Sequence, residues 1–239
     1  MTPTFNAGGK IAATISSVAS QDRTFFDYRI VDGGSTDATL EVIRRTAPDV
    51  DLLSERDAGV YDAINKGIAR STGRFLYILG AGDVLRPGVL ASIAERLAAA
   101  PPNSIVYGNV YWVGLDRVYD PRFSKRDLTV RCVCHQSMFL DRSLFALHGM
   151  YDLRYPISSD WHFNIRAFCD PRVQTQYIDI VIADYEGGGI SDTGHDAQFQ
   201  SDLPGLVRRS FGIRYWLLLW MDRMRRRARG IASALKSRL

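Results

Sequence analysis

Residues 26–37, FDYRIVDGGSTD, contain the pattern that decides the fold. The run from Phe26 to Val31 has the character of a β-strand, and it ends at an Asp-Gly-Gly turn. Ser35 or Thr36 can then cap a helix that continues to Arg45, because a hydroxyl oxygen accepts a hydrogen bond from a free N–H group of the first helical turn. The stretch therefore predicts a strand, a tight turn and a helix.

Strand-like and helical patterns keep alternating through the first half of the chain. Residues 51–54 and 75–79 are predicted strands, and 62–71 and 87–98 are predicted helices. In the less regular second half we predict strands at 104–111, 117–119, 133–140 and 174–185, and a helix at 160–168. Strands that alternate with helices indicate an α/β fold with a mostly parallel central sheet and helices on both faces.

The charge of the 239-residue chain is unevenly distributed. Residues 205–239 hold nine Arg and one Lys against one Asp, whereas the first 204 residues hold 20 basic and 25 acidic side chains. We therefore interpret 1–204 as one α/β domain and 205–239 as a basic, amphipathic helical tail.

Residues 211–229, FGIRYWLLLWMDRMRRRAR, join Trp, Tyr and Leu to an arginine cluster. This composition is typical of a helix that lies on an anionic membrane surface. A helix packed on the domain with a solvated basic end is the alternative. Nucleic acid is not an expected partner, because no module of interleaved aromatic and basic residues is present.

Three cysteines, Cys132, Cys134 and Cys169, argue against a disulfide scaffold and suit a reducing compartment. The first residues do not resemble a signal peptide, and no run approaches the ~18–20 apolar residues of a membrane-spanning helix. We expect a cytoplasmic protein that is peripheral on the inner face of the cell membrane.

Two acidic turns follow predicted strands, where open α/β sheets bind ligands. Asp32 could accept hydrogen bonds from a base or ribose, although a plain strand-to-helix turn with an N-cap is favoured when this motif is taken alone. Asp83, in the sequence Gly80-Ala81-Gly82-Asp83, could hold a divalent cation together with diphosphate oxygens, or it could cap the helix near Arg86.

A dense polar run, SERDAGVYDAINKG, occupies residues 54–67. Asp62, Asn65 and Lys66 share one face of the predicted helix because of their i, i+3 and i+4 spacing. Arg56 and Lys66 could neutralise phosphate charge. An ordinary solvated helix face is the alternative.

Together these segments resemble the family 2 glycosyltransferases, which have the GT-A fold. Residues 2–6 (TPTFN) resemble the end of that family's first strand, 32–37 its DGGSTD turn and 54–67 its SE.D.GIYDAMNKG stretch. The resemblance covers roughly residues 1–190, and the ordered set is more specific than any single motif.

The resemblance implies a role for each matching position on the donor side. Pro3, Thr4 and Asp32 are implied to contact the nucleoside of a nucleotide-sugar, Asp57, Asn65 and Lys66 to line the donor pocket, and Asp83 to bind Mn²⁺ or Mg²⁺.

Two departures from the family pattern affect this donor site. Where the family often has LNADD, residues 79–83 are LGAGD, so Gly82 replaces a carboxylate beside the donor. Few apolar residues precede TPTFN in this sequence, so either the first strand is shortened or the start of the gene was placed too late.

Two further segments are implied to form the acceptor side. His135-Gln136 resembles the family's HQ..F segment, and ISSDWH at 157–162 resembles the segment that supplies the catalytic base, which would be Asp160. A helix N-cap is the alternative for Asp160, and Trp161 either stacks on a sugar or belongs to the core. Residues 187–191, GGGIS, resemble the family's loop after the last core strand and suit a lid.

The sequence thus favours an inverting glycosyltransferase that acts on a saccharide or lipid-linked saccharide in the assembly of a surface polysaccharide. A sugar nucleotidyltransferase would need a glycine-rich loop for a triphosphate, for which residues 6–10 (NAGGK) are a faint candidate. A catalytically impaired scaffold that keeps the fold is the other alternative.

Overall fold

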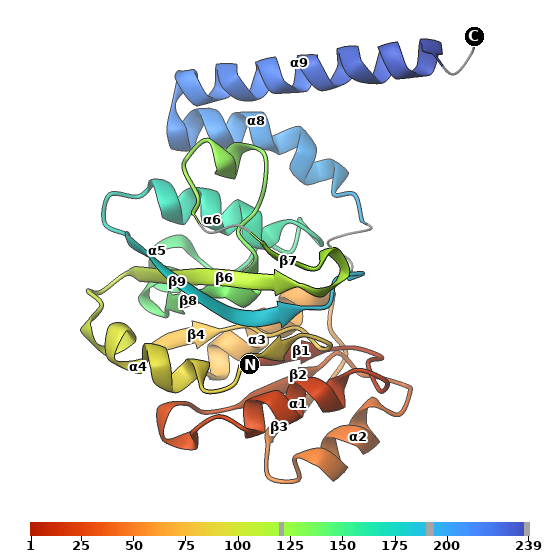
Figure 1. Cartoon of the computed structure of the whole chain (residues 1–239), viewed down its shortest axis with the longest axis vertical. Helices are drawn as coiled ribbons and strands as arrows, with labels where there is room; N and C mark the ends of the chain where they lie inside the picture. Colours follow the sequence, from red (N-terminus) through yellow and green to blue (C-terminus); the bar gives the residue numbers. More distant parts are fainter. Residues whose placement is uncertain (120–121, 190–193, 237–239) are drawn as a thin grey trace.

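The computed structural model describes residues 1–119, 122–189 and 194–236, with side chains to Arg225. Its first sheet contains three parallel strands in the order β1 (Thr2–Thr4), β2 (Arg29–Asp32) and β3 (Asp51–Ser54). The helices α1 (Ile11–Ala19), α2 (Thr39–Thr46) and α3 (Val60–Arg70) follow these strands one by one. This is the predicted α/β alternation, and β1 has only three residues (Figure 1).

The second sheet has the order β4-β8-β6-β9-β5, and β7 pairs with β6. Its strands are β4 (Phe75–Tyr77), β5 (Val84–Leu85), β6 (Ser104–Trp112), β7 (Arg117–Tyr119), β8 (Met138–Asp141) and β9 (Gln174–Tyr185). In this sheet β6 and β9 are parallel, and the other pairs are antiparallel.

The two sheets meet at Met1. Its nitrogen donates to the Tyr77 carbonyl (2.8 Å), and the N–H of Leu79 donates to the Met1 carbonyl (3.0 Å). This is the pattern of adjacent parallel strands. The turns after β1, β2, β3 and β4 therefore face the same way.

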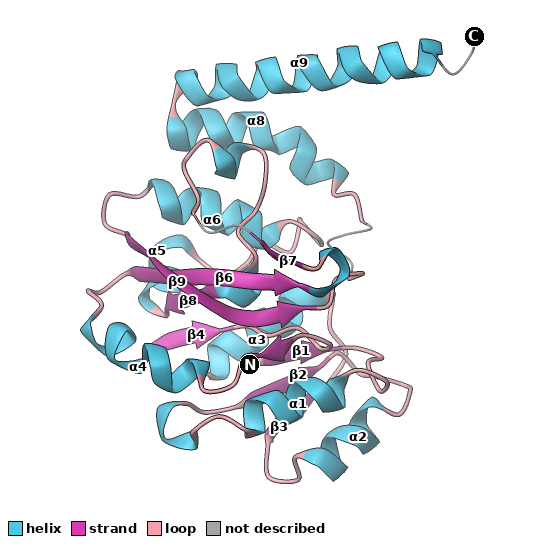
Figure 2. Ribbon diagram, in the orientation of Figure 1, coloured by secondary structure: helices cyan, strands magenta, loops and turns pink. Residues whose placement is uncertain are grey.

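Helices cover both faces of the sheets, as Figure 2 shows. One apolar core contains Ile11 and Ile15 of α1 and Ile93 of α4 (Val89–Ala99). The other contains Ile64 of α3 and Phe163 of α6 (Ser159–Cys169), with α5 (Ser143–His148) nearby. Burial of these apolar faces fixes the sheets between two helical layers.

Two of the predicted starts of elements were wrong. The helix after the Asp-Gly-Gly turn begins at Thr39, where the Asp37 carboxylate accepts the Thr39 N–H (2.9 Å), while the Ser35 hydroxyl donates to Asp32. Residues 133–137 are not a strand, because His135–Ser137 form a 3-10 turn before β8.

Two helices form the C-terminal part of the described chain: α8 (Ala197–Phe211) and α9 (Ile213–Lys236). The predicted start of the tail at residue 205 lies inside α8, whose Phe199 and Leu206 are buried in the core. α9 packs along α8 and forms the outermost layer (Figure 1). None of the described helices combines the length and the apolar character needed to span a bilayer.

Candidate functional site

The carboxyl ends of the parallel strands bring the first predicted residues together. Thr4, Asp32 and Ser54 lie at one level of the sheet, and Pro3 lies one residue earlier, opposite Val31. Pro3, Thr4 and Asp32 are all buried. The residues predicted to contact the nucleoside therefore lie at the ligand-binding edge of an α/β sheet.

Asp32 organises the turn that follows its own strand. Its Oδ2 atom accepts hydrogen bonds from the N–H groups of Gly34 (3.1 Å) and Ser35 (3.0 Å) and from the Ser54 hydroxyl (2.8 Å). Beside it, the buried Thr4 hydroxyl has no hydrogen-bond partner among the described residues. A buried polar atom of this kind is usually satisfied by water or a ligand.

Asp57 reaches this turn from the loop before α3. A Cβ atom at Gly33 would lie 2.3 Å from Asp57 Oδ2, so only glycine at position 33 leaves room for this carboxylate. Asp57 Oδ1 accepts the Gly59 N–H (2.9 Å), which fixes the side chain. The structure thus brings Asp57 and Asp32 to the same turn, and their contact with a donor stays a prediction.

Asn65 and Lys66 are bonded within the protein. The Asn65 amide donates to the Tyr151 carbonyl (2.8 Å) and accepts the Tyr151 N–H (3.0 Å). Lys66 forms ion pairs with Glu55 (2.9 Å) and Asp62 (3.2 Å). Both side chains therefore hold α3 to its surroundings, and their contact with a donor stays a prediction.

The glycine-rich loop at residues 6–10 does not offer its N–H groups to a triphosphate. The N–H groups of Asn6, Ala7 and Gly8 donate to Ser35 Oγ (2.8 Å), Thr39 Oγ1 (2.7 Å) and Asp37 Oδ2 (3.0 Å). These bonds fasten the loop to the start of α2. The feature that favoured a nucleotidyltransferase is therefore a structural turn.

Asp83 is 6% exposed, and each of its carboxylate oxygens accepts a hydrogen bond. Gln136 Nε2 lies 2.6 Å from Oδ2, and the Glu186 N–H lies 3.1 Å from Oδ1. Burial raises the pKa of Asp83, while the Gln136 bond and the nearby His135 oppose this shift. The alternative role as a helix cap was wrong, because Gly88 is the N-cap of α4.

A divalent cation at Asp83 would not find a complete set of protein ligands among the described residues. Among the described residues, no three His, Cys, Asp or Glu side chains cluster so that they could hold a metal ion. Gly82, with φ of 114°, adds no second ligand. Magnesium is often held by one or two carboxylates plus substrate phosphates. These residues therefore fit a cation only together with a donor diphosphate.

Asp160 lies in the first turn of α6, and the helix N-cap is Ser158, so the capping alternative was wrong. Asp160 Oδ1 lies 2.7 Å from the Tyr61 hydroxyl and from the Trp161 N–H, and Oδ2 lies 3.7 Å from His135 Nδ1. All of these residues except Tyr61 line a cavity of about 320 Å³, which Gln136 also lines.

Three aromatic side chains of this cavity were missed in the sequence. The ring of Trp112 stands edge-on to Tyr119 and to Tyr185, each 5.5 Å away between centroids. Trp161 also lines the cavity, but its indole N–H donates to Leu128 (2.7 Å) and anchors it to the core. Trp112, Tyr119 and Tyr185 come from β6, β7 and β9. The alternation of side chains along a strand does not show whether a ring faces a cavity or the core.

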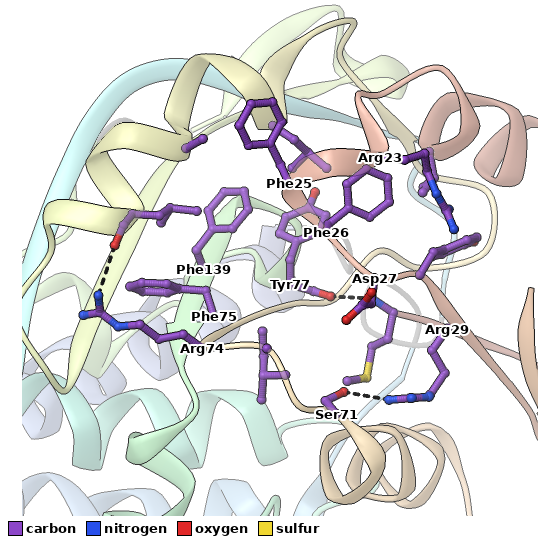
Figure 3. A pocket seen from close by; sticks show the side chains of 18 of the residues that line it. Arg23, Phe25, Phe26, Asp27, Arg29, Ser71, Arg74, Phe75, Tyr77 and Phe139 are labelled. Carbon is purple, nitrogen blue, oxygen red and sulfur yellow. Dashed lines mark hydrogen bonds between the residues drawn. The ribbon is translucent and has the colours of Figure 1, made fainter.

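A larger cavity, of about 570 Å³, lies at the other end of the strands (Figure 3). Its lining includes Arg29 at the start of β2, Phe75 at the start of β4, and the rings of Phe26 and Phe139. Asp32 and Asp83 follow the opposite ends of these strands. Cavity size therefore does not identify the predicted site.

Of the predicted lid, Gly187–Gly189 follow β9, and Ile190 and Ser191 lie outside the described residues.

Comparison with solved structures shows the same fold. Staphylococcus aureus TarS (residues 1–349, in complex with UDP) aligns with a TM-score of 0.66 and 16% identity over 89% of this chain and 71% of that chain. The mannosyltransferase PcManGT of Pyrobaculum calidifontis, in complex with GDP-Man and Mn²⁺, aligns with a TM-score of 0.63 and 16% identity over 98% and 79%.

Sequence relatives give a closer match. A PGL/p-HBAD biosynthesis glycosyltransferase of Mycobacterium bovis is 39% identical over 224 residues, which are 91% of this chain and 87% of the relative. A glycosyltransferase of Mycobacterium tuberculosis is 36% identical over 181 residues, 72% and 69% of the two chains. The sequence pattern of Glycosyl transferase family 2 matches residues 1–152. The chain therefore belongs to glycosyltransferase family 2 and has the GT-A fold.

Proposed function

We propose that this glycosyltransferase moves a sugar from a nucleotide-sugar to a saccharide or lipid-linked saccharide with inversion at the anomeric carbon. One observation carries the proposal. His135 and Gln136 are neighbours in one turn, and they connect the two halves of the site: Gln136 bonds Asp83, and His135 lies 3.7 Å from Asp160. The donor diphosphate and the acceptor hydroxyl would thus meet across this turn.

In the proposed reaction Asp160 is the general base. The acceptor oxygen attacks the anomeric carbon as its proton passes to the Asp160 carboxylate, and the bond from that carbon to the diphosphate oxygen breaks. A single displacement inverts the configuration and needs no covalent enzyme intermediate. Tyr61 and His135 would hold the carboxylate in position, because each lies against one of its oxygens.

Asp83 would bind Mn²⁺ or Mg²⁺ together with the donor diphosphate. Such a cation, when bound, stabilises the negative charge that the leaving diphosphate gathers. Asp32, Asp57 and the unsatisfied Thr4 hydroxyl would face the nucleoside. The solved relatives carry UDP or GDP-Man, which agrees with a nucleotide-sugar donor without selecting the base.

The acceptor would enter the cavity beside Asp160. The aromatic rings of Trp112, Tyr119 and Tyr185 give this cavity apolar surfaces of the kind that pack on the C–H face of a sugar. The Mycobacterium bovis relative is named for PGL/p-HBAD biosynthesis, and a sugar-bearing lipid is the corresponding acceptor proposed here.

A lipid-linked acceptor calls for a membrane contact, and α9 has a face that suits one. Five exposed apolar side chains follow one another at helical spacing: Ile213, Leu217, Trp220, Met221 and Met224. Tyr215 and Leu219 point the other way and pack on the domain. The arginine-rich sequence 223–229 continues the same helix. We propose that this face rests on the anionic inner surface of the cell membrane, with the protein in the cytoplasm.

The test separates binding from chemistry. Asp160→Asn should lower turnover by about 10²–10⁴-fold while nucleoside diphosphate binding, followed by thermal unfolding with Mn²⁺, stays at the level of the unmodified protein. Asp49→Asn changes an exposed carboxylate in the turn before β3 that does not line this cavity, and this matched control should change neither. Full turnover in Asp160→Asn would remove the base assignment. A well-folded protein that no nucleoside diphosphate stabilises would favour a scaffold instead.

A further inference from the structure

Gly82 stands where the family often has a carboxylate, and the side chain that lies over it is Lys10. A Cβ atom at Gly82 would be 3.4 Å from Lys10 Cδ and 3.8 Å from Lys10 Cβ. The aliphatic stem of Lys10 therefore covers the glycine. A Cβ atom here would make ordinary van der Waals contact with that stem, but the backbone of an aspartate would be strained at a φ of 114°.

The helix that carries Lys10 is fastened to the Gly82–Asp83 turn. The buried Thr14 hydroxyl accepts the Gly82 N–H (2.9 Å) and donates to the Asp83 carbonyl (2.8 Å). Lys10 and Thr14 are four residues apart at the start of α1, so they lie on the same side of the chain. These two bonds fix the base of the Lys10 side chain beside Asp83.

Lys10 differs from the other lysine of this region in its partners. Lys66 is already paired with Glu55 and Asp62. No ion pair or hydrogen bond of the Lys10 ammonium group occurs among the described residues, and the side chain is exposed. Because the ammonium lies only two bonds beyond Cδ, it remains close to the turn and free to take an anion.

We propose that Lys10, whose stem lies over Gly82, binds the diphosphate of the nucleotide-sugar donor. This inference rests on the proposed function. At this turn Gly82 adds no negative charge and Lys10 adds a positive one, and both features favour a bound diphosphate. Lys10 is thus a donor-binding residue that directs specificity to the phosphate groups.

A contact between Lys10 and phosphate is tested with ligands that share one nucleoside and differ in the number of phosphate groups. Calorimetric titration with UDP, GDP, UMP and uridine first establishes which nucleoside diphosphate the unmodified protein binds. Lys10→Met should then weaken binding of that diphosphate about tenfold, equal to about 1.4 kcal/mol, and reduce its salt dependence. Binding of the nucleoside alone should change less than about twofold.

Two further variants make the result specific. Lys10→Arg keeps the charge and should retain most of the affinity. Lys125→Met removes one exposed lysine elsewhere, with the same change in net charge, and should behave as the unmodified protein. Equal diphosphate affinity in Lys10→Met, or an equal loss for the nucleoside, would overturn the inference while leaving the proposed function intact. Absence of diphosphate binding by the unmodified protein would remove both.

Discussion

The hydroxyl of Tyr61 lies 2.7 Å from Oδ1 of Asp160, although the two residues are 99 positions apart in the chain. The same hydroxyl lies 2.8 Å from the Ile157 carbonyl, and its single proton can serve one acceptor at a time. A charged acceptor makes the stronger hydrogen bond, so the carboxylate is favoured. Burial and the neighbouring Asp160 raise the pKa of Tyr61 well above its usual range, so the hydroxyl remains a donor at neutral pH.

Tyr61→Phe should therefore lower kcat by about tenfold, because one hydrogen bond to a charged group is worth ~1.5–3 kcal/mol. Donor affinity should not change. Steady-state kinetics give kcat, and thermal unfolding with a nucleoside diphosphate gives the donor affinity.

The matched control is Tyr155→Phe, which removes a hydroxyl bonded to Asp202 (2.8 Å) instead of Asp160. It should leave kcat unchanged. If both variants show the same small loss of kcat, Tyr61 is only a packing residue.

Asn65 gives a prediction about stability. Its amide pairs with both the N–H and the carbonyl of Tyr151, and loss of buried partners typically costs ~1–3 kcal/mol. Asn65→Ala should lower the free energy of unfolding by this amount in urea denaturation, with nucleoside diphosphate affinity reduced less than about threefold. A large loss of affinity in a fully stable variant would instead place Asn65 in the donor pocket.

The sequence predicted where the donor-side residues lie in the fold better than where the acceptor-side residues lie. Asp32 ends a strand and Asp83 comes after one, and the edge where strands of an α/β sheet end is predictable from the strand pattern alone. Asp57 lies next to Gly33, a neighbour that the sequence motif does not predict. The start of α2 was predicted wrongly because Ser35 and Thr36 are equally good caps in the sequence. In the structure the Asp37 carboxylate accepts the first N–H of the helix instead.

The acceptor side depends on contacts between distant segments. Tyr61 belongs to the polar motif at residues 54–67, yet only the packing of α3 against α6 shows that it reaches Asp160. Trp112 and Tyr185 become neighbours because β6 and β9 pair in a register with a bulge, which a strand pattern does not reveal. Local patterns determine elements, whereas register and helix packing decide which side chains share a cavity.

His162 predicts how stability depends on pH. Burial, and next the charge of Arg166, lower the pKa of His162 to about 4. Between pH 6.5 and 4 only the unfolded chain takes up this proton, so the free energy of unfolding should fall as the pH falls through that window. After allowance for solvent screening, the contribution is on the order of 1–2 kcal/mol.

His162→Gln removes the group and should flatten that part of the stability curve. Urea denaturation of both proteins at several pH values from 4 to 7.5 measures the difference between their free energies of unfolding. Burial also lowers the pKa of His148, but its contribution is common to both proteins and cancels in this difference. Parallel curves for the two proteins would show that His162 is not responsible.

The exposed face of α9 predicts membrane binding. Trp220 is 51% exposed and Leu217 is 46% exposed on that face. Replacing both with Gln should lower binding to phosphatidylglycerol vesicles at least about tenfold in a sedimentation assay, because buried apolar area drives interfacial binding. Phe25→Gln, which removes a ring that is 50% exposed elsewhere, is the control. Equal binding of all three proteins would assign the α9 face another role.

Gly33 and Asp57 should act as one unit in donor binding. A methyl group at position 33 would lie 2.3 Å from Asp57 Oδ2, but the end of a side chain can rotate away without moving the backbone. Gly33→Ala should therefore keep the melting temperature within a few degrees while it displaces the carboxylate. Its affinity for the nucleoside diphosphate should fall about tenfold, as far as that of Asp57→Ala. This is the loss expected when one hydrogen bond to a charged acceptor is removed.

The double variant decides whether the two losses have one cause. If Gly33→Ala acts only by displacing Asp57, then Gly33→Ala/Asp57→Ala should bind no more weakly than Asp57→Ala alone, because residues in contact are not additive. Gly9→Ala is the control, since a Cβ atom there meets nothing within 4 Å. Additive losses would mean that the methyl group blocks the ligand directly. In that case Gly33 itself, rather than the carboxylate it admits, lines the nucleoside pocket.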